Sequence, residues 1–232
     1  KFWFSLTENI IPNHFITDDI IEQYPGLKEH ESILKGRSMI VKKAKPLAVE
    51  CIVRGYITGS GWSEYKKQGT ICGIKLKEGL VESEKLYTPI FTPSTKAEQG
   101  EHDENIDFES CVGIIGQELA EKVRDFSIKI YSTAHDYAKE KGIIIADTKF
   151  EFGLIGDELI LIDEVLTPDS SRFWPKNLYG EGRGQQSYDK QFVRDYLTSV
   201  GWDKNPPAPE LPKDIASLTS QKYIEAIDLL TA

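Results

Sequence analysis

The clearest pattern along the chain is helical and covers residues 108–141. Apolar side chains recur there at intervals of three and four residues, which places them on one side of a helix. They are Ile115, Leu119, Val123, Phe126, Ile130, Ala134 and Tyr137. Gly142 follows, and glycine is common just past a helix end because it adopts left-handed conformations without strain. The pattern predicts one long amphipathic helix.

The strongest strand signal follows directly, over residues 143–165. Two apolar runs flank the Gly-Asp pair at 156–157, which is typical of a tight β-turn. Along the first run Asp147, Lys149 and Glu151 occupy alternate positions, so all three should project from one face. The segment predicts a β-hairpin with one polar face.

The start of the chain has weaker patterns. Residues 1–45 mix short apolar pieces with polar breaks and a charged, helical stretch near 18–31, and they predict no core of their own. The Lys45-Pro46 step is a reasonable boundary, because proline restricts the residue before it.

The end of the chain predicts two helices. One lies near residues 190–199, and the other follows a Pro-rich and therefore extended spacer at 202–212. The last helix is amphipathic. We expect it to dock on the main domain through Ile215, Leu218, Tyr223, Ile227 and Leu230.

Composition narrows the possible classes of protein. With 232 residues, 40% of them hydrophobic, the chain can bury a sizeable core. No apolar run approaches the roughly 20 residues that cross a bilayer, so we expect no membrane span. The net charge of −9 disfavours a general nucleic-acid surface, because phosphate binding relies on clustered Lys and Arg. Any anionic ligand must therefore meet a local basic pocket.

Three cysteines are an odd and sparse set. They make a disulfide scaffold or a four-thiolate metal site improbable, and they fit a reducing cytoplasm.

The chain also begins at Lys1, without a methionine, and runs straight into FWFSL. That start is neither a signal peptide nor a natural beginning, and we expect the chain to be a fragment.

The stretch LIDEVLTPDSSRFW combines two kinds of chemistry. The second hairpin strand ends in Asp163 and Glu164, and an acid at the end of a buried strand is costly unless it is paired or binds a cation. Glu151 and Asp163, on adjacent strands, are oxygen ligands suited to a Mg²⁺ that bridges nucleotide phosphates. Ser171 and Arg172 then suit a phosphate or carboxylate. The alternative is a solvated sheet face.

A shared metal constrains the hairpin register. A two-residue turn pairs Ile155 with Glu158 and leaves Glu151 and Asp163 on opposite faces. We therefore expect an odd loop over residues 156–158, or an equivalent bulge, with Glu151 directly across from Asp163. Their Cβ atoms should then lie about 5 Å apart.

A second constellation is VRGYITGSGW, in which Arg54 ends a strand. The glycines allow backbone amides to approach an anion closely, and Ser60 lies inside the turn. A plain hairpin loop is the alternative.

The long polar loop over residues 91–105 contains Lys96, His102 and Asp103. It is either a surface loop or part of a site, and it lacks the spacing of a helical zinc motif.

Five stretches together resemble the SAICAR synthetase family, the phosphoribosylaminoimidazole-succinocarboxamide synthases. They are VECIVRGYITGSGW, IFTPSTKAEQGEHDEN, IIIADTKFEFGL, LIDEVLTPDSSRFW and SYDKQFVRDYL. The resemblance implies an α+β, two-lobed fold related to ATP-grasp enzymes and protein kinases. Residues 1–45 would be the remainder of a small N-terminal ATP-binding lobe, whose Gly-rich part is expected upstream of Lys1. Residues 46–232 would form the larger lobe, with the substrate site and a C-terminal helix.

The resemblance also implies a reaction of purine biosynthesis. ATP, with Mg²⁺, would activate the carboxylate of carboxyaminoimidazole ribonucleotide (CAIR) as an acyl phosphate. The amine of L-aspartate would attack it, giving SAICAR, ADP and phosphate. A cytoplasmic monomer or homodimer is expected, with small molecules as its partners.

The family's functional residues map onto several positions of this chain. Reaction-centre and metal positions are Asp147, Lys149, Glu151 and Asp163. Positions for the ribonucleotide are Arg54, Ser60, Lys96, Asp103, Ser171 and Arg172. Positions for the aspartate carboxylates are Lys190 and Arg194, and a hinge strand that presents backbone groups to adenine includes Lys43, Ala44 and Leu47.

Two other functions use the same residues. A kinase-like small-molecule phosphotransferase also has Asp147, then Lys149, then a hairpin and a metal-binding acid. The cations beyond that set, Arg54, Arg172, Lys190 and Arg194, suit a ribonucleotide and a dicarboxylate better than an acceptor hydroxyl. A nucleotide-binding regulatory module without catalysis is the second alternative.

Overall fold

The protein is built around one antiparallel sheet. A computed structural model describes residues 1–96, 104–188, 191–203 and 205–232. Seven strands form the sheet, with the order β10–β9–β4–β7, while β11 and β3 also pair with β9 and β8 pairs with β4. The strands are β3 (Lys45–Pro46), β4 (Val49–Tyr56), β7 (Lys85–Phe91), β8 (Ser94–Thr95), β9 (Ile143–Ile155), β10 (Glu158–Ile162) and β11 (Ser171–Pro175). The predicted hairpin is confirmed as β9 and β10.

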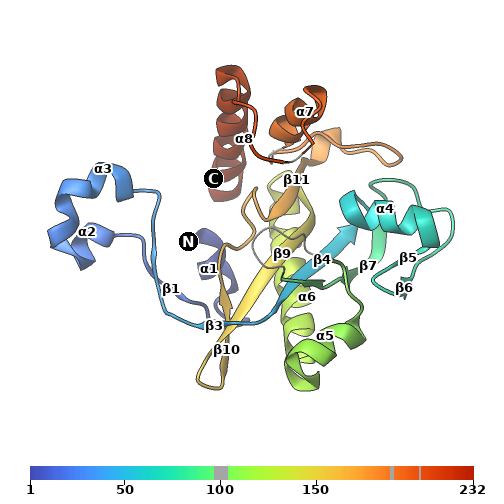
Figure 1. Cartoon of the computed structure of the whole chain (residues 1–232), viewed down its shortest axis with the longest axis horizontal. Helices are drawn as coiled ribbons and strands as arrows, with labels where there is room; N and C mark the ends of the chain where they lie inside the picture. Colours follow the sequence, from blue (N-terminus) through green and yellow to red (C-terminus); the bar gives the residue numbers. More distant parts are fainter. Residues whose placement is uncertain (97–103, 189–190, 204) are drawn as a thin grey trace.

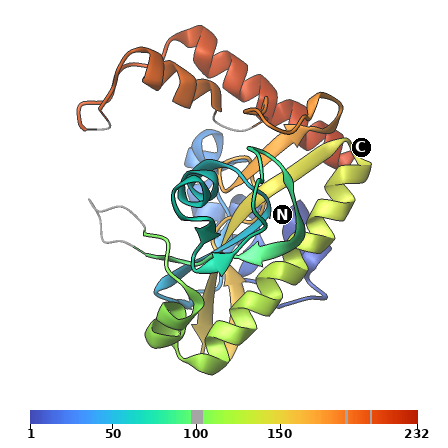
Figure 2. The ribbon, with the colours of Figure 1, turned by 90° about the vertical axis from the view of Figure 1, so that its right-hand side faces the viewer.

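Helix α6 (Gln117–Glu140) packs along one face of this sheet (Figure 2). Its buried side chains repeat at three and four residues and join the core around β4 and β9; they include Ala120, Val123, Ile130, Ala134 and Ala138. The predicted single helix over 108–141 is wrong in one respect. Gly116, at φ 85° and ψ 155°, separates α5 (Phe108–Ile115) from α6. Both pieces are helical, so the fold class remains α+β.

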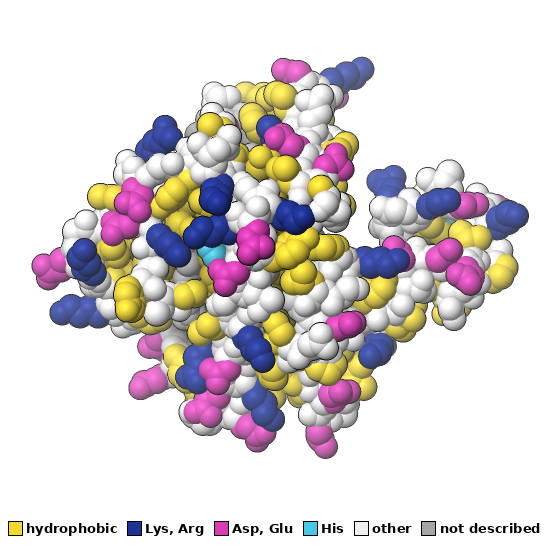
Figure 3. Space-filling model, turned by 180° about the vertical axis from the view of Figure 1, so that it is seen from behind, with side chains coloured by type: hydrophobic (Ala, Val, Ile, Leu, Met, Phe, Trp, Pro, Cys, Tyr) yellow, Lys and Arg dark blue, Asp and Glu magenta, His cyan; other side chains and the backbone are white. Residues whose placement is uncertain are grey.

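The N-terminal residues divide between the body and a projecting unit. Helix α1 (Phe2–Thr7) packs into the main core through Trp3 and Phe4. The short helices α2 (Ile20–Gln23), η1 (Pro25–His30) and α3 (Glu31–Leu34) stand away from the body. They are attached by a two-stranded ribbon of β1 (Phe15–Thr17) and β2 (Ile40–Val41). The unit is separate in Figure 1 and, from behind, in Figure 3.

Two helices at the C-terminal end lie against each other beyond β11. They are α7 (Gln191–Ser199) and α8 (Lys213–Thr231) (Figure 1). The predicted docking face of α8 is partly wrong, because Leu230 is buried but Ile227 is 56% exposed and Leu218 39% exposed. Ala226, four residues before Leu230, is the second buried contact. Among the residues described, no helix is long and apolar enough to cross a membrane.

The buried His135 of α6 makes stability depend on pH. Its Nδ1 lies 3.2 Å from the Ile145 carbonyl, and its Nε2 has no partner. Burial lowers the pKa of His135 below its ordinary value of 6.5. The folded protein therefore keeps this ring neutral at a pH where the unfolded chain protonates it, and stability falls as the pH drops below 6.5.

We expect His135→Gln to reduce this loss, because glutamine cannot take up the proton. Between pH 6.5 and 5.5 the group can account for at most about 1 kcal/mol of the wild-type decrease. Urea unfolding at pH 7.5, 6.5 and 5.5 measures it for both proteins. Equal decreases in the two proteins would contradict the assignment.

Candidate functional site

The face of the sheet opposite α6 carries a buried ion pair. Arg54 of β4 lies directly across from Asp147 of β9, and their side chains are 2% and 6% exposed. Arg54 Nη1 lies 3.2 Å from Asp147 Oδ2, Nε donates to Thr92 Oγ1 at 3.0 Å, and Nη2 donates to Ser60 Oγ at 3.0 Å. Burial lowers the pKa of Arg54, and the charge of Asp147 opposes that effect. The guanidinium is held on three sides.

A second guanidinium reaches the same oxygen. Arg172 Nη1 lies 2.5 Å from Asp147 Oδ2, and the Arg172 side chain is 27% exposed. The register explains this approach: Ser171 pairs with Thr148 and Phe173 with Ile145, so β9 has one more residue than β11 in this interval. Such a β-bulge re-aims side chains. One carboxylate therefore faces two guanidinium groups.

The Gly-rich stretch is the start of a helix. We predicted a turn there, but α4 (Gly59–Gln68) begins at Gly59, which has φ 56°, and Ser60 lies in its first turn. The Arg172 guanidinium packs against this glycine so closely that a Cβ on Gly59 would lie 2.4 Å from Nη2. A pocket of about 350 Å³ opens beside the contact; its lining includes Thr58, Gly59, Glu82, Arg172, Gln185 and Asp195.

A row of alternating charges continues along the same face. Lys149 Nζ lies 2.5 Å from Glu50 Oε1 and 3.7 Å from Glu151 Oε1. Glu151 also pairs with Lys96. These contacts confirm that Lys149 and Glu151 share a face. Burial lowers the pKa of Lys149, but Glu50, Glu151 and Asp163 outweigh it, and the pKa lies above 10.5.

The predicted hairpin register is wrong. Ile155 pairs with Glu158 and Glu151 pairs with Ile162, which is the two-residue turn rather than the odd loop. Asp163 therefore does not lie across from Glu151. It follows the last paired residue, is exposed, and has a left-handed backbone at φ 61°. That conformation takes Asp163 out of the alternation of the strand.

A metal at this end of the face would use few protein ligands. Within the described ranges, no group of three or more His, Cys, Asp or Glu side chains could hold an ion. Glu151 lies 3.7 Å from the Lys149 amine, and the charges of Glu151 and Asp163 both raise the pKa of Lys149. Mg²⁺ commonly takes one or two carboxylates, with waters and substrate phosphates completing its shell. The donor set therefore fits Mg²⁺ with a nucleotide better than an all-protein cage.

Several other predicted residues lie elsewhere. Ser171 is buried, with its Oγ 2.8 Å from Thr148 Oγ, so its hydroxyl is engaged inside the sheet. Leu47 donates its backbone N–H to the Phe152 carbonyl at 2.9 Å. Lys43 and Ala44 precede β3. Arg194 lies on α7. Asp103 and Lys190 lie outside the described residues.

Sequence reasoning missed Glu50 and Thr92. Glu50 is 5% exposed, and Ser94 Oγ lies 3.4 Å from its Oε2. Its signal was available, since Glu50, Ile52 and Arg54 alternate along β4 just as Asp147, Lys149 and Glu151 do along β9. Thr92 lies just after β7, where no local pattern marked it.

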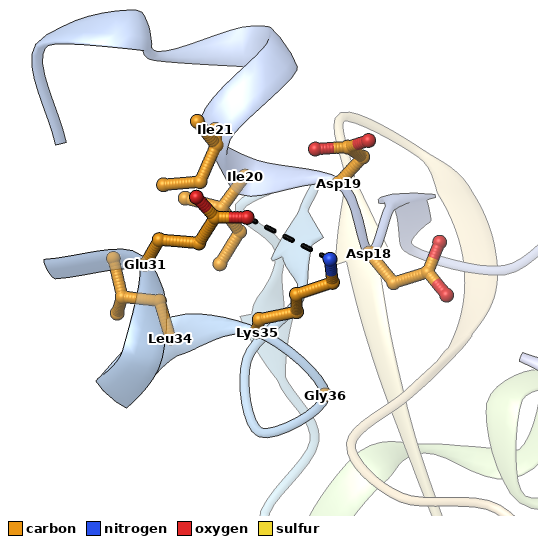
Figure 4. A pocket seen from close by; sticks show the side chains of 8 residues that line it. All are labelled: Asp18, Asp19, Ile20, Ile21, Glu31, Leu34, Lys35 and Gly36. Atoms are coloured by element: carbon orange, nitrogen blue, oxygen red, sulfur yellow. Dashed lines mark ion pairs between the residues drawn. The ribbon is translucent and has the colours of Figure 1, made fainter. Parts of the chain in front are cut away.

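A second pocket lies in the projecting unit, away from this face. It measures about 380 Å³ and is lined by Asp18, Asp19, Ile20, Ile21, Glu31, Leu34, Lys35 and Gly36 (Figure 4). Lys35 Nζ lies 3.6 Å from Glu31 Oε1, one turn before it on the same short helical stretch. An exposed pair of this kind contributes little, and none of our predicted site residues lines the pocket.

Comparison with known proteins gives a consistent answer. A family described as SAICAR synthetase matches residues 1–209. Phosphoribosylaminoimidazole-succinocarboxamide synthase of Geobacter sulfurreducens is 61% identical over 231 residues, covering 100% of this chain and 78% of that protein. The synthase of Trichlorobacter lovleyi is 59% identical, with 98% and 77% covered. The SAICAR-synthase structure from Saccharomyces cerevisiae, complexed with SAICAR, has a TM-score of 0.90 and 47% identity, with 99% and 78% covered.

Gly59→Ala tests the close approach of Arg172. We expect this change to cost about 1 to 2 kcal/mol for the left-handed backbone and, in addition, to push Arg172 away from Asp147. Gly69→Ala is the matched control: Gly69 ends the same helix at φ 71°, with open space around it. Urea unfolding compares the two, and a crystal structure locates Arg172. Equal losses with the Arg172–Asp147 contact intact would refute the close-approach argument.

Proposed function

The chain belongs to the SAICAR synthetase family, and we propose that its polar sheet face is where ATP-dependent ligation of CAIR to L-aspartate takes place. The observation that carries this assignment is the single Asp147 carboxylate shared by Arg54 and Arg172. It prepares an anion site beside a row of acids and a lysine on the same sheet. The yeast relative, 47% identical, is described as complexed with SAICAR, the reaction product.

Arg54, Arg172 and Ser60 would hold the phosphate of the ribonucleotide. Arg54 is fixed by its three partners and lies at the back of the site, whereas the partly exposed Arg172 can offer donors to a ligand. The first turn of α4 presents backbone N–H groups next to Ser60, and helix N-termini attract phosphate. Lys96 and Asp103 would contact the same substrate. Ser171 would support this site through its bond to Thr148.

Asp147 and Lys149 would line the reaction centre. The γ-phosphoryl group of ATP passes to the CAIR carboxylate, releasing ADP and leaving an acyl phosphate. The aspartate amine attacks that carbon, the new C–N bond forms as the C–O bond to the phosphate breaks, and the phosphate leaves as hydrogen phosphate with the proton that the amine loses. Lys149 is a cation in this region and would stabilise the negative charge on the transferred group. Asp147 would keep both arginines in place.

Glu151 and Asp163 would hold Mg²⁺ with the nucleotide. The ion supplies charge neutralisation on the phosphates when it is bound. Glu151 also pairs with Lys96 and Lys149, which balance its charge. Lys43, Ala44 and the Leu47 carbonyl would contact adenine.

The remaining assignments concern the two lobes, the L-aspartate site, the cellular location and the oligomeric state. Residues 1–45 would complete the small ATP-binding lobe, and residues 46–232 would form the larger lobe. Lys190 and Arg194 would bind the carboxylates of L-aspartate. A cytoplasmic location agrees with three buried, free cysteines. We propose a monomer or homodimer.

Phosphate release separates this function from the two alternatives. The full-length protein with ATP and Mg²⁺ should release phosphate only when CAIR and L-aspartate are both present. A kinase-like phosphotransferase would ignore aspartate, and a binding module would release no phosphate. Either result would contradict the proposed assignment of this face.

Arg172→Ala should raise KM for CAIR by about tenfold or more, because a charge-assisted contact to phosphate is lost. Stability should change little, since Asp147 keeps Arg54 as a partner. KM for each substrate and urea unfolding measure the two effects. An unchanged KM for CAIR with a large loss of stability would make Arg172 a structural residue.

Glu151→Gln and Asp163→Asn should each raise the Mg²⁺ concentration needed for half-maximal rate. Both changes keep the shape of the side chain but remove a negative oxygen ligand. KM for CAIR measured at saturating Mg²⁺ should stay near its wild-type value. If neither variant alters the Mg²⁺ requirement, these two carboxylates are not the ligands.

A further inference from the structure

Two loops that are far apart in the sequence are bonded to each other. Residues 80–84 directly precede β7, and residues 179–185 follow β11 and one short helical turn. Ser83 Oγ donates to the Arg183 carbonyl at 2.9 Å, and the Tyr179 hydroxyl donates to the Ser83 carbonyl at 2.8 Å. Ser83 therefore bonds to the 179–185 loop through both its side chain and its backbone.

Both loops line the pocket that contains Arg172. Gly182 donates its N–H to the Glu82 carbonyl at 2.7 Å, which adds a backbone bond between the two loops. Glu82 comes from the first loop, Gly184 and Gln185 come from the second, and all three line the pocket together with Arg172. The bonds between the loops therefore determine where the 179–185 side of the pocket lies.

The Arg183 carbonyl accepts hydrogen bonds from both loops. Ser83 Oγ donates to it at 2.9 Å, and Gln185 Nε2 donates to it at 2.7 Å. Gln185 also bonds to Gly180, because its Oε1 accepts from the Gly180 N–H at 3.1 Å and its Nε2 donates to the Gly180 carbonyl at 2.5 Å. Gln185 thus closes the 179–185 loop on itself, and Ser83 attaches the closed loop to the 80–84 loop.

The backbone of Ser83 points to a role for its hydroxyl. Ser83 is 0% exposed and has a left-handed backbone at φ 64°, which is unfavourable for a residue with a Cβ. Its N–H donates to the Ile57 carbonyl at 2.8 Å, next to Thr58 of the pocket lining. Glycine would adopt this conformation without strain, but it would have no donor for the Arg183 carbonyl. Such strain persists where the surroundings over-determine it, often at ligand sites.

We propose that Ser83 is a positioning residue for the ribonucleotide: its buried hydroxyl holds the 179–185 loop, and so places Gly184 and Gln185 at the pocket beside Arg172. The inference rests on the proposed function, in which Arg172 holds the phosphate of CAIR. Ser83 acts through the loop and does not touch the ligand. A loop that is held less firmly must be ordered when the ligand binds, and that ordering reduces affinity.

Ser83→Gly tests the inference in the full-length protein. The change removes the hydroxyl and relieves the left-handed backbone, while the Arg183 carbonyl keeps Gln185 as a donor. CAIR binding, measured by calorimetry, should weaken about three- to tenfold. The urea midpoint should stay near or above that of the wild type, and KM for ATP should stay within about twofold. A lower urea midpoint with unchanged CAIR binding would overturn the inference and make Ser83 a structural residue.

Tyr179→Phe and Tyr65→Phe form a matched pair. Each change removes a tyrosine hydroxyl that donates to a backbone carbonyl of the segment before β7, Tyr179 to Ser83 at 2.8 Å and Tyr65 to Lys77 at 2.8 Å. The first bond comes from the 179–185 loop, whereas the second comes from α4. Tyr179→Phe should weaken CAIR binding about three- to tenfold, and Tyr65→Phe should leave it within about twofold. Equal weakening in the two variants would contradict the positioning role.

Arg172→Ala separates this inference from the function on which it rests. If Arg172→Ala weakens CAIR binding and Ser83→Gly does not, the phosphate assignment stands and Ser83 has no positioning role. If Arg172→Ala leaves CAIR binding unchanged, the pocket does not hold the phosphate, and the inference is overturned together with that assignment. Weakening in Arg172→Ala, Ser83→Gly and Tyr179→Phe, with Tyr65→Phe near the wild type, supports it.

Discussion

The structure depends on keeping the Arg54 guanidinium charged inside the sheet. A buried cation is tolerated only when its donors and its charge are satisfied. Asp147 supplies the charge, and Thr92 and Ser60 supply acceptors from two other parts of the chain. These contacts bring β4, β9, the end of β7 and the start of α4 to one place. The geometry of the charged face thus follows from the need to neutralise the buried Arg54 guanidinium.

Two glycines near the end of β4 make room for the side chains around Arg54. Gly55 faces α6, where a Cβ would lie 2.0 Å from the Tyr131 hydroxyl oxygen, and Gly59 faces Arg172. The Tyr131 hydroxyl in turn donates to the Ile145 carbonyl at 2.7 Å, next to the bulge of β9. The α6 contact, the bulge of β9 and the arginine pair therefore lie close together around the end of β4.

The sequence predicted the elements better than their junctions. The β9–β10 hairpin, α6 and the shared face of Lys149 and Glu151 were predictable, because alternation and helical periodicity are local properties. The break at Gly116, the helical start at Gly59 and the left-handed Asp163 were not, because each depends on the backbone conformation of a single residue, which neither alternation nor helical periodicity reveals. The hairpin register was inferred from an assumed metal. The structure has the two-residue turn instead, with Glu151 across from Ile162.

The ribbon of β1 and β2 has a mechanical consequence. It carries the whole projecting unit, and a two-stranded ribbon resists stretching while it twists and bends readily. The ribbon meets the body where Lys42 donates its N–H to the His14 carbonyl at 2.7 Å, close to where β3 is fixed on β9. A rotation of the unit relative to the body would therefore act first on this small junction. The same backbone segment is bonded to Leu161 of β10, so the junction connects the unit to the edge of the main sheet.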